Sequence, residues 1–88
     1  SDKKHLLNKN QEIIFNFLKL ILNYFAGQNS IAPRILATSD ELKQYIKEGD
    51  ARFMHGIRYE IFGIHAQKLV EGKLRFSIKD GNLNIDES

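Results

Sequence analysis

The stretch from Ile13 to Phe25 is apolar on most sides of the helix that its spacing predicts. Its flanking and internal polar residues recur at intervals of four, three and four, so they fall on one narrow helical stripe. A surface helix normally buries one apolar stripe and exposes the rest to water. We therefore expect a helix from about Gln11 to Phe25 or Ala26, capped by Asn8 or Asn10 and ended by Gly27. It is either the central helix of the domain or packs against a surface outside these 88 residues. The polar stripe consists of Glu12, Asn16, Lys19 and Asn23.

This apolar stretch is thirteen residues long, whereas a membrane-spanning helix needs about 20 mostly apolar residues. It is therefore not expected to be a membrane-spanning helix. Of the 88 residues, 42% are hydrophobic and 27% are charged, which is typical of one folded domain and too apolar for a disordered chain. We expect residues 1–9 to form a flexible N-terminal segment and residues 10–86 to form the single domain.

The chain contains no cysteine and does not begin with methionine. The lack of cysteine excludes disulfides, thiolate zinc sites and thiol nucleophiles, and it suits the cytoplasm, where we expect the protein to act. The first residue leads us to expect a processed or excised piece of a longer protein.

Capping signals predict the second helix. Residues 31–38 include the one proline, and we expect them to form a linker with at most one helical turn. Thr38 and Glu41 then match a capping box, which predicts a helix over residues 39–48 that ends at Gly49.

Apolar residues at helical spacing continue after Gly49. We expect one helix over residues 51–62, a break at Gly63, and a short helix over residues 64–71 that ends at Gly72.

The last segment changes to alternating apolar and polar residues, the period of a β-strand. Asp80-Gly81 is a strong two-residue turn signal, so residues 73–86 are predicted to form a hairpin whose apolar face docks on the helices. The fold is thus expected to be mainly α, a small bundle with a C-terminal two-stranded β-hairpin. The predicted cross-strand pairs are Ile78 with Leu83, Phe76 with Ile85, Ser77 with Asn84 and, as an ion pair, Arg75 with Asp86.

No catalytic arrangement is visible in the sequence. The carboxylates are scattered, and the histidines, His5, His55 and His65, lack a second ligand at a spacing that metal sites use. No serine lies in a nucleophile motif, and no glycine-rich phosphate loop occurs. We therefore expect that this chain alone is not an enzyme and holds no catalytic residue, metal or cofactor.

The distribution of charge permits contact with a nucleic acid but does not require it. Residues 1–79 hold 13 bases and eight acids, a net +5, whereas residues 80–88 hold three acids and no base. On the third predicted helix Arg52, His55 and Tyr59 are expected to share a face, with Arg58 beside it, where phosphates could bind and the tyrosine could stack on a base. The alternative is a solvated helix face. The cations on the outer face of the hairpin could likewise bind an anion or only prevent edge-to-edge association of strands.

Several stretches of the chain together form a recognisable pattern. They are Asn10-Gln11-Glu12 before the long helix, residues 31–42 (IAPRILATSDEL), residues 56–63 (GIRYEIFG) and Gly72-Lys73-Leu74. On these stretches, from about Asn10 to Ile85, the chain resembles the C-terminal region of bacterial ribonuclease D, especially the alphaproteobacterial form. The family often has Gly-Trp-Arg where this chain has Gly56-Ile57-Arg58, so only Arg58 of the candidate contacts both matches the family motif and suits a phosphate.

The resemblance implies an HRDC-like helical module that assists a separate N-terminal exonuclease domain. In the family that domain trims RNA, including tRNA precursors, from the 3′ end, and it uses four acidic residues that hold two divalent metals, Mg or Mn. No matching motif occurs in this chain, so no catalytic residue carries over. The implied partners are RNA and the exonuclease domain of the parent chain.

The resulting hypothesis is a domain that binds RNA through its backbone and positions it for the exonuclease. The alternative is a protein-interaction or dimerisation module that packs through the apolar first helix, without RNA contact. A small DNA-binding protein is disfavoured because no recognition helix with several outward bases is apparent. The candidate RNA contacts are Arg34, Arg52, Arg58, Tyr59, Lys68 and Lys73.

Overall fold

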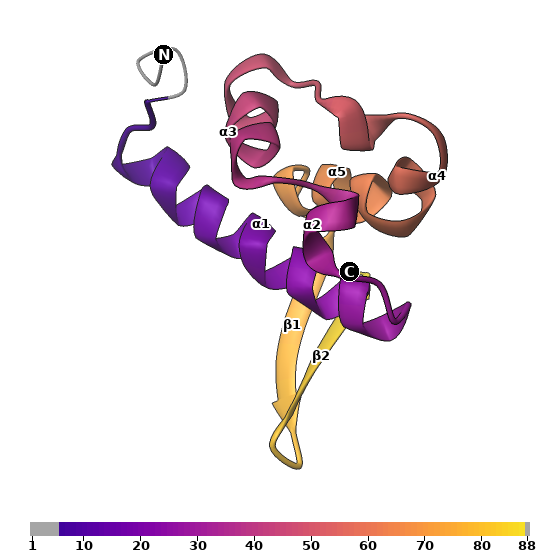
Figure 1. Cartoon of the computed structure of the whole chain (residues 1–88). Coiled ribbons are helices and arrows are strands. Elements are labelled where there is room, and N and C mark those ends of the chain that lie inside the picture. Colours follow the sequence, from indigo (N-terminus) through magenta and orange to yellow (C-terminus); the bar gives the residue numbers. More distant parts are fainter. Residues whose placement is uncertain (1–5, 88) are drawn as a thin grey trace.

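The computed structural model describes residues 6–87; residues 1–5 and residue 88 lie outside the described part. The fold is mainly α-helical with a C-terminal two-stranded antiparallel hairpin, which confirms the predicted class. Figure 1 shows α1 along one side of the molecule, the shorter helices gathered against it, and the hairpin projecting away from them. The elements are α1 (Lys9–Gln28), α2 (Pro33–Leu36), α3 (Ser39–Glu48), η2 (Arg52–Met54), α4 (Gly56–Arg58), η3 (Tyr59–Gly63), α5 (Ile64–Val70), β1 (Leu74–Lys79) and β2 (Asn82–Glu87).

Helix α1 is longer than the sequence predicted at both ends. It begins after Asn8, whose side chain accepts the backbone N–H of Gln11 at 2.8 Å, while the Gln11 side chain accepts the Asn8 N–H at 3.0 Å. This reciprocal cap fixes the start of the helix within residues 1–9, the segment that was expected to be flexible. Residues 1–5 of that segment lie outside the described residues. Gly27 does not end the helix, which continues to Gln28. Among residues 6–87, no helix combines the length and apolar character needed to cross a bilayer.

One face of α1 supplies a large share of the core. Phe53, in η2, is fully buried and lies between Tyr45 of α3 and Phe62 of η3, with ring centroids 5.4 and 5.0 Å away. The single-turn α2 and the capped α3 occupy the positions that the linker and capping box predicted. The core residues are Leu18, Ile21, Leu22, Ala26, Leu36, Ala37, Leu42, Tyr45, Ala51, Phe53, Phe62 and Ala66.

The predicted helix break at Gly63 was wrong. The chain is extended at His55, and a helical segment then runs from Gly56 through α4, the π-helical turn η3 and α5 to Val70. Gly63 lies inside it because a Cβ there would collide with the carbonyl oxygen of Phe53 and lie 2.9 Å from the ring of Tyr59. The glycine therefore permits close approach of η2 rather than interrupting the helix.

The break at His55 has a consequence for the predicted RNA-binding face. Arg52 lies in η2, whereas Arg58 ends α4 and Tyr59 begins η3. Arg52 and Tyr59 are thus not on one continuous helix, and the prediction of a shared face for them was wrong.

The hairpin has the predicted register, with Ile78 opposite Leu83 and Phe76 opposite Ile85. Its turn residues Asp80 and Gly81 have φ angles of 53° and 77°, as a type I′ turn requires. The prediction of an Arg75–Asp86 ion pair was wrong, because these residues are opposite each other but form none within residues 6–87.

The hairpin docks through its base only. Phe76 packs against Phe17 of α1 with ring centroids 5.6 Å apart, and Leu74 and Ile85 are also half-buried against the core. Ile78, nearer the turn, is 71% exposed. The prediction of an apolar face docked on the helices therefore holds at the base and fails towards the turn, which extends away from the bundle (Figure 1).

Candidate nucleic-acid interface

Two of the predicted RNA-binding arginines have partners within the fold. Arg52 Nε lies 2.8 Å from the carboxylate of Glu41, whose side chain is only 17% exposed. Arg58 donates from Nε to the carbonyl oxygen of Ile35 at 2.8 Å and so joins α4 to α2. An RNA phosphate that bound either guanidinium at these atoms would compete with the acceptor already in place.

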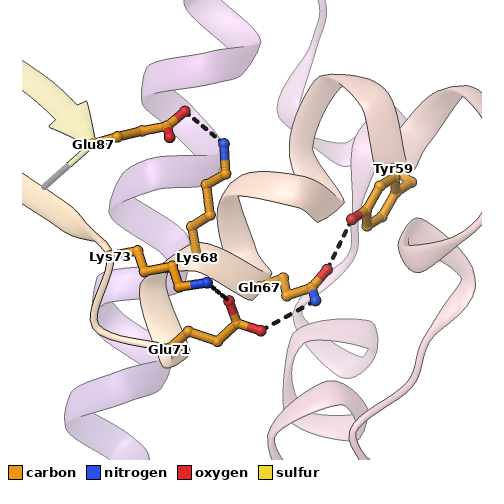
Figure 2. A network of polar contacts seen from close by, with 6 residues as sticks. All are labelled: Tyr59, Gln67, Lys68, Glu71, Lys73 and Glu87. Carbon is orange, nitrogen blue, oxygen red and sulfur yellow. Dashed lines mark hydrogen bonds and ion pairs between the residues drawn. The ribbon is translucent and has the colours of Figure 1, made fainter.

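Tyr59 and Lys73 belong to one chain of polar contacts (Figure 2). The Tyr59 hydroxyl donates to Gln67 Oε1 at 2.8 Å, and Gln67 Nε2 donates to Glu71 at 3.2 Å. Lys73 Nζ lies 3.2 Å from the other oxygen of Glu71. The hydrogen bond from Gln67, followed by that from Lys73, holds the pKa of Glu71 below its usual value.

Lys68 of α5 pairs with Glu87 of β2 at 2.5 Å and ties the end of the hairpin to the last helix (Figure 2). This lysine is the largest cause that holds the pKa of Glu87 below its usual value. Its side chain is 23% exposed, so little of it is presented to a ligand.

Arg34 is the one member of the predicted set for which the described part of the chain offers no ion-pair or hydrogen-bond partner. The structure brings two of the predicted contacts, Tyr59 and Lys73, into one network, and Lys68 lies on the same helix as Gln67 of that network. Arg34 on α2 and Arg52 on η2 lie on other elements. All six residues stay predicted RNA contacts, and five of them have intramolecular partners.

A groove beside Arg34 contains residues that the sequence reasoning did not select. It has a volume of about 320 Å³ and lies between α1, α2 and the start of α3. Lys19 had been assigned only to the polar stripe of α1, and its recurrence with Asn23 on that stripe was the signal that could have identified it. The lining residues are Lys19, Leu22, Asn23, Pro33, Arg34, Ala37, Thr38, Ser39 and Leu42.

Lys19 and Lys43 both lie over the ring of Phe15, with Nζ 5.4 and 5.6 Å from its centroid. These cation–π contacts bring a lysine of α1 and a lysine of α3 to the same aromatic ring. Neither lysine has an ion-pair partner among residues 6–87. Together with Arg34 they are cations that remain available to an anionic ligand.

His5 lies outside the described residues, and His55 and His65 have separate surroundings. His55 lies 2.8 Å from the carboxylate of Asp50 at the surface. His65 stacks on Phe25, and its burial is the main reason that its pKa lies below the usual value. Among residues 6–87, no group of three or more histidine, cysteine, aspartate or glutamate side chains could hold a metal ion.

Helix α1 also exposes apolar side chains on the face away from the buried one. Ile13 is 56% exposed, Phe17 41% and Leu20 40%. With Asn16 they line a shallow groove of about 200 Å³. The apolar excess in the sequence of this helix is thus only partly used inside the domain.

These observations define a small helical domain with an appended hairpin, several surface cations without an ion-pair partner within residues 6–87, and an apolar face of α1 that the hairpin covers only in part, at Phe17. The sequence matches the C-terminal part of curated proteins named ribonuclease D. The match confirms the resemblance seen in the sequence.

Three of these relatives are from alphaproteobacteria. The Bartonella henselae protein is 35% identical over 97% of this chain, that from Zymomonas mobilis 34% over 94%, and that from Sphingobium indicum 35% over 94%. The chain spans 22% of the length of each relative. No protein-family model matches it, and no solved structure is a significant match.

Proposed function

We propose that this chain is an accessory RNA-binding, substrate-positioning domain of a ribonuclease D-like 3′–5′ exoribonuclease that acts in RNA and tRNA 3′ processing in the cytoplasm. The observation that carries the proposal is the match, along nearly the whole chain, to the C-terminal part of proteins named ribonuclease D. The metal-dependent hydrolysis, with Mg or Mn, belongs to the remaining part of such a protein. The HRDC-like assignment belongs to the same proposal.

The unpartnered cations support an electrostatic mode of binding. Cations already held by carboxylates, such as Lys68 by Glu87, gain less from a phosphate than cations with no carboxylate partner within residues 6–87, such as Lys19 and Arg34. Such contacts recognise the phosphodiester backbone without reading the base sequence. The domain would therefore hold many RNA 3′ ends with similar affinity.

The test is a titration of a fluorescently labelled single-stranded RNA with the 88-residue chain at several salt concentrations. The logarithm of the binding constant is expected to fall linearly with the logarithm of the salt concentration, by about 0.7 for each phosphate neutralised. Two RNAs of equal length and different sequence should bind with similar affinity. Absence of binding, or binding that salt does not weaken, would contradict the proposal.

A second candidate function rests on the apolar face of α1, defined by Ile13, Phe17 and Leu20. Because the chain spans 22% of its relatives, most of a ribonuclease D-like polypeptide lies outside it, and the rest of that polypeptide is the occupant we assign to this face. The domain would then serve to pack against the parent protein, without RNA contact.

The substitution Ile13→Asp tests this second candidate. Because Ile13 is 56% exposed, the change should leave the free energy of unfolding of the isolated chain within about 0.5 kcal/mol of the wild-type value. In the longer parent protein it should speed proteolytic cleavage between this domain and the rest. If Ile13→Asp affects the isolated chain and the longer parent protein equally, the result would count against docking of this face on the parent protein. Concentration-dependent sedimentation of the isolated chain that Ile13→Asp abolishes would assign the face to a second copy instead.

A further inference from the structure

The groove between α1, α2 and the start of α3 combines an apolar floor with a basic and polar rim. Leu22, Ala37 and Leu42 are almost fully buried and form part of the floor. Its volume of about 320 Å³ is at the lower end of the range of small-ligand pockets, which begins near 300 Å³. The rim residues are Lys19, Asn23, Arg34, Thr38 and Ser39.

The charged side chains that line the groove are both positive. Lys19 and Arg34 are its charged lining residues, and the lining contains no carboxylate. Neither side chain takes part in an ion pair among residues 6–87. Lys43 adds a further positive charge nearby, since it shares the ring of Phe15 with Lys19. Cations held near one another without a counter-charge gain most from an anionic ligand.

The other rim groups suit the rest of a nucleotide unit. The hydroxyl of Ser39 has no hydrogen-bond partner within the described part of the chain, and the Thr38 hydroxyl, which accepts the N–H of Glu41, can still donate its own proton. Hydroxyl donors supplement basic side chains at phosphate oxygens. The apolar floor could contact the carbon face of a ribose.

We propose that this groove is the phosphate-binding subsite for single-stranded RNA, with Lys19 and Arg34 as the two principal phosphate contacts and Lys43 as the next cation along the strand. The inference rests on the proposed function, because that function selects RNA among possible anions. It moves the centre of binding from the partnered cations Arg58 and Lys68 to the unpartnered pair at the groove.

The experiment compares two double variants that remove equal charge. Lys19→Gln/Arg34→Gln removes the two groove cations, whereas Arg75→Gln/Lys79→Gln removes two exposed cations from strand β1. None of these four residues has an ion-pair partner within residues 6–87, so the unfolding midpoint, which is measured first, should change little in either variant. The groove variant also loses the contact of Lys19 with the ring of Phe15, which stabilises little at an exposed site, and RNA binding is compared at a temperature where both variants are folded. Binding of labelled oligouridylate is then titrated at several salt concentrations.

The groove variant should bind the RNA roughly five- to thirtyfold more weakly than wild type, as expected for two lost surface charge contacts. The slope of log affinity against log salt concentration should become shallower by about 1.4, since each of two lost phosphate contacts contributes about 0.7. The hairpin variant should change affinity less than threefold, as expected if its cations make no phosphate contact.

The remaining outcomes separate this inference from the proposed function. If both variants weaken binding equally, the domain binds RNA but the groove is not its subsite. If the wild type does not bind oligouridylate, the proposed function fails and the groove assignment fails with it. Inorganic phosphate is titrated as a competitor; if it displaces the RNA at an equal phosphate concentration, the groove is a site for free phosphate and its assignment to RNA is overturned.

Discussion

The imidazole ring of His65 in α5 lies parallel to the phenyl ring of Phe25 in α1, with centroids 3.6 Å apart and an interplanar angle of 5°. This stack holds the last helix against the first. Burial is the main cause that lowers the pKa of His65 from its ordinary value of 6.5, and repulsion by Lys68 adds to it, while Glu87 acts in the opposite direction. The folded state therefore favours the neutral ring.

The first prediction follows from this lowered pKa. Because the unfolded chain binds the His65 proton more readily than the folded chain does, the free energy of unfolding should be largest above pH 6.5 and fall as the pH drops towards the lower folded-state pKa. Urea unfolding between pH 8 and pH 5 measures this slope. His65→Phe retains an aromatic ring for the stack and should remove the part of the slope that His65 causes.

His55→Phe is the matched control, because its side chain is 70% exposed and lies outside the stack. This variant should keep the stability loss that His65 causes on acidification. A His65→Phe variant with the wild-type pH slope would contradict the structural explanation.

The second prediction concerns Gly63. A methyl group at this position would overlap the carbonyl oxygen of Phe53 and crowd the ring of Tyr59, so Gly63→Ala should destabilise the protein by about 1–3 kcal/mol. Gly27→Ala is the control: Gly27 lies in α1 with nothing within 4 Å of an added Cβ, so that change should stabilise by about 0.5–1 kcal/mol. Chemical denaturation of the two variants measures the difference. Equal shifts would show that the close approach to η2 carries no energetic weight.

The glycines also show what the sequence could and could not predict. Gly49 ends α3 with a left-handed φ of 77°, as its position after a capped, amphipathic helix predicted. Gly63 was predicted to break a helix because a glycine within a helical pattern is ambiguous from local sequence. Its actual role depends on Phe53, ten residues earlier in the chain, approaching its backbone, and only tertiary packing determines that approach.

The hairpin register was predictable because the turn signal and the two-residue alternation constrain the same pairs, among them Phe76 with Ile85. How far the hairpin docks was not predictable. Alternation shows which side chains share a face, but it does not show where the helices beneath that face end.

The candidate site was harder to predict than the fold. Sequence identifies cations, whereas their availability depends on whether the fold supplies an acceptor. Glu41 lies next to Arg52 and Glu87 next to Lys68 only after the elements have packed, and the latter pair is 19 residues apart. Lys19 and Arg34, 15 positions apart, meet at one groove for the same reason.

The third prediction tests the partial docking of the hairpin. Phe76 is half-buried against Phe17, so Phe76→Ala should lower the free energy of unfolding by about 1–2 kcal/mol, part of the value for a fully buried phenylalanine. Ile78 is 71% exposed, and Ile78→Ala should change stability by less than about 0.5 kcal/mol. Thermal unfolding followed by circular dichroism compares the two. A larger loss for Ile78→Ala would mean that the region near the turn is covered in solution.

The last prediction separates a structural arginine from a binding arginine. Arg58 donates to the Ile35 carbonyl, so Arg58→Gln should lower the free energy of unfolding by about 1 kcal/mol. Arg34 has no partner in the described part of the chain, and Arg34→Gln should leave stability within about 0.5 kcal/mol of wild type. RNA affinity, measured at a temperature where both variants are folded, should show the opposite order, with the larger loss for Arg34→Gln. A larger affinity loss for Arg58→Gln would instead support Arg58, one of the RNA contacts predicted from the sequence, as the direct phosphate contact.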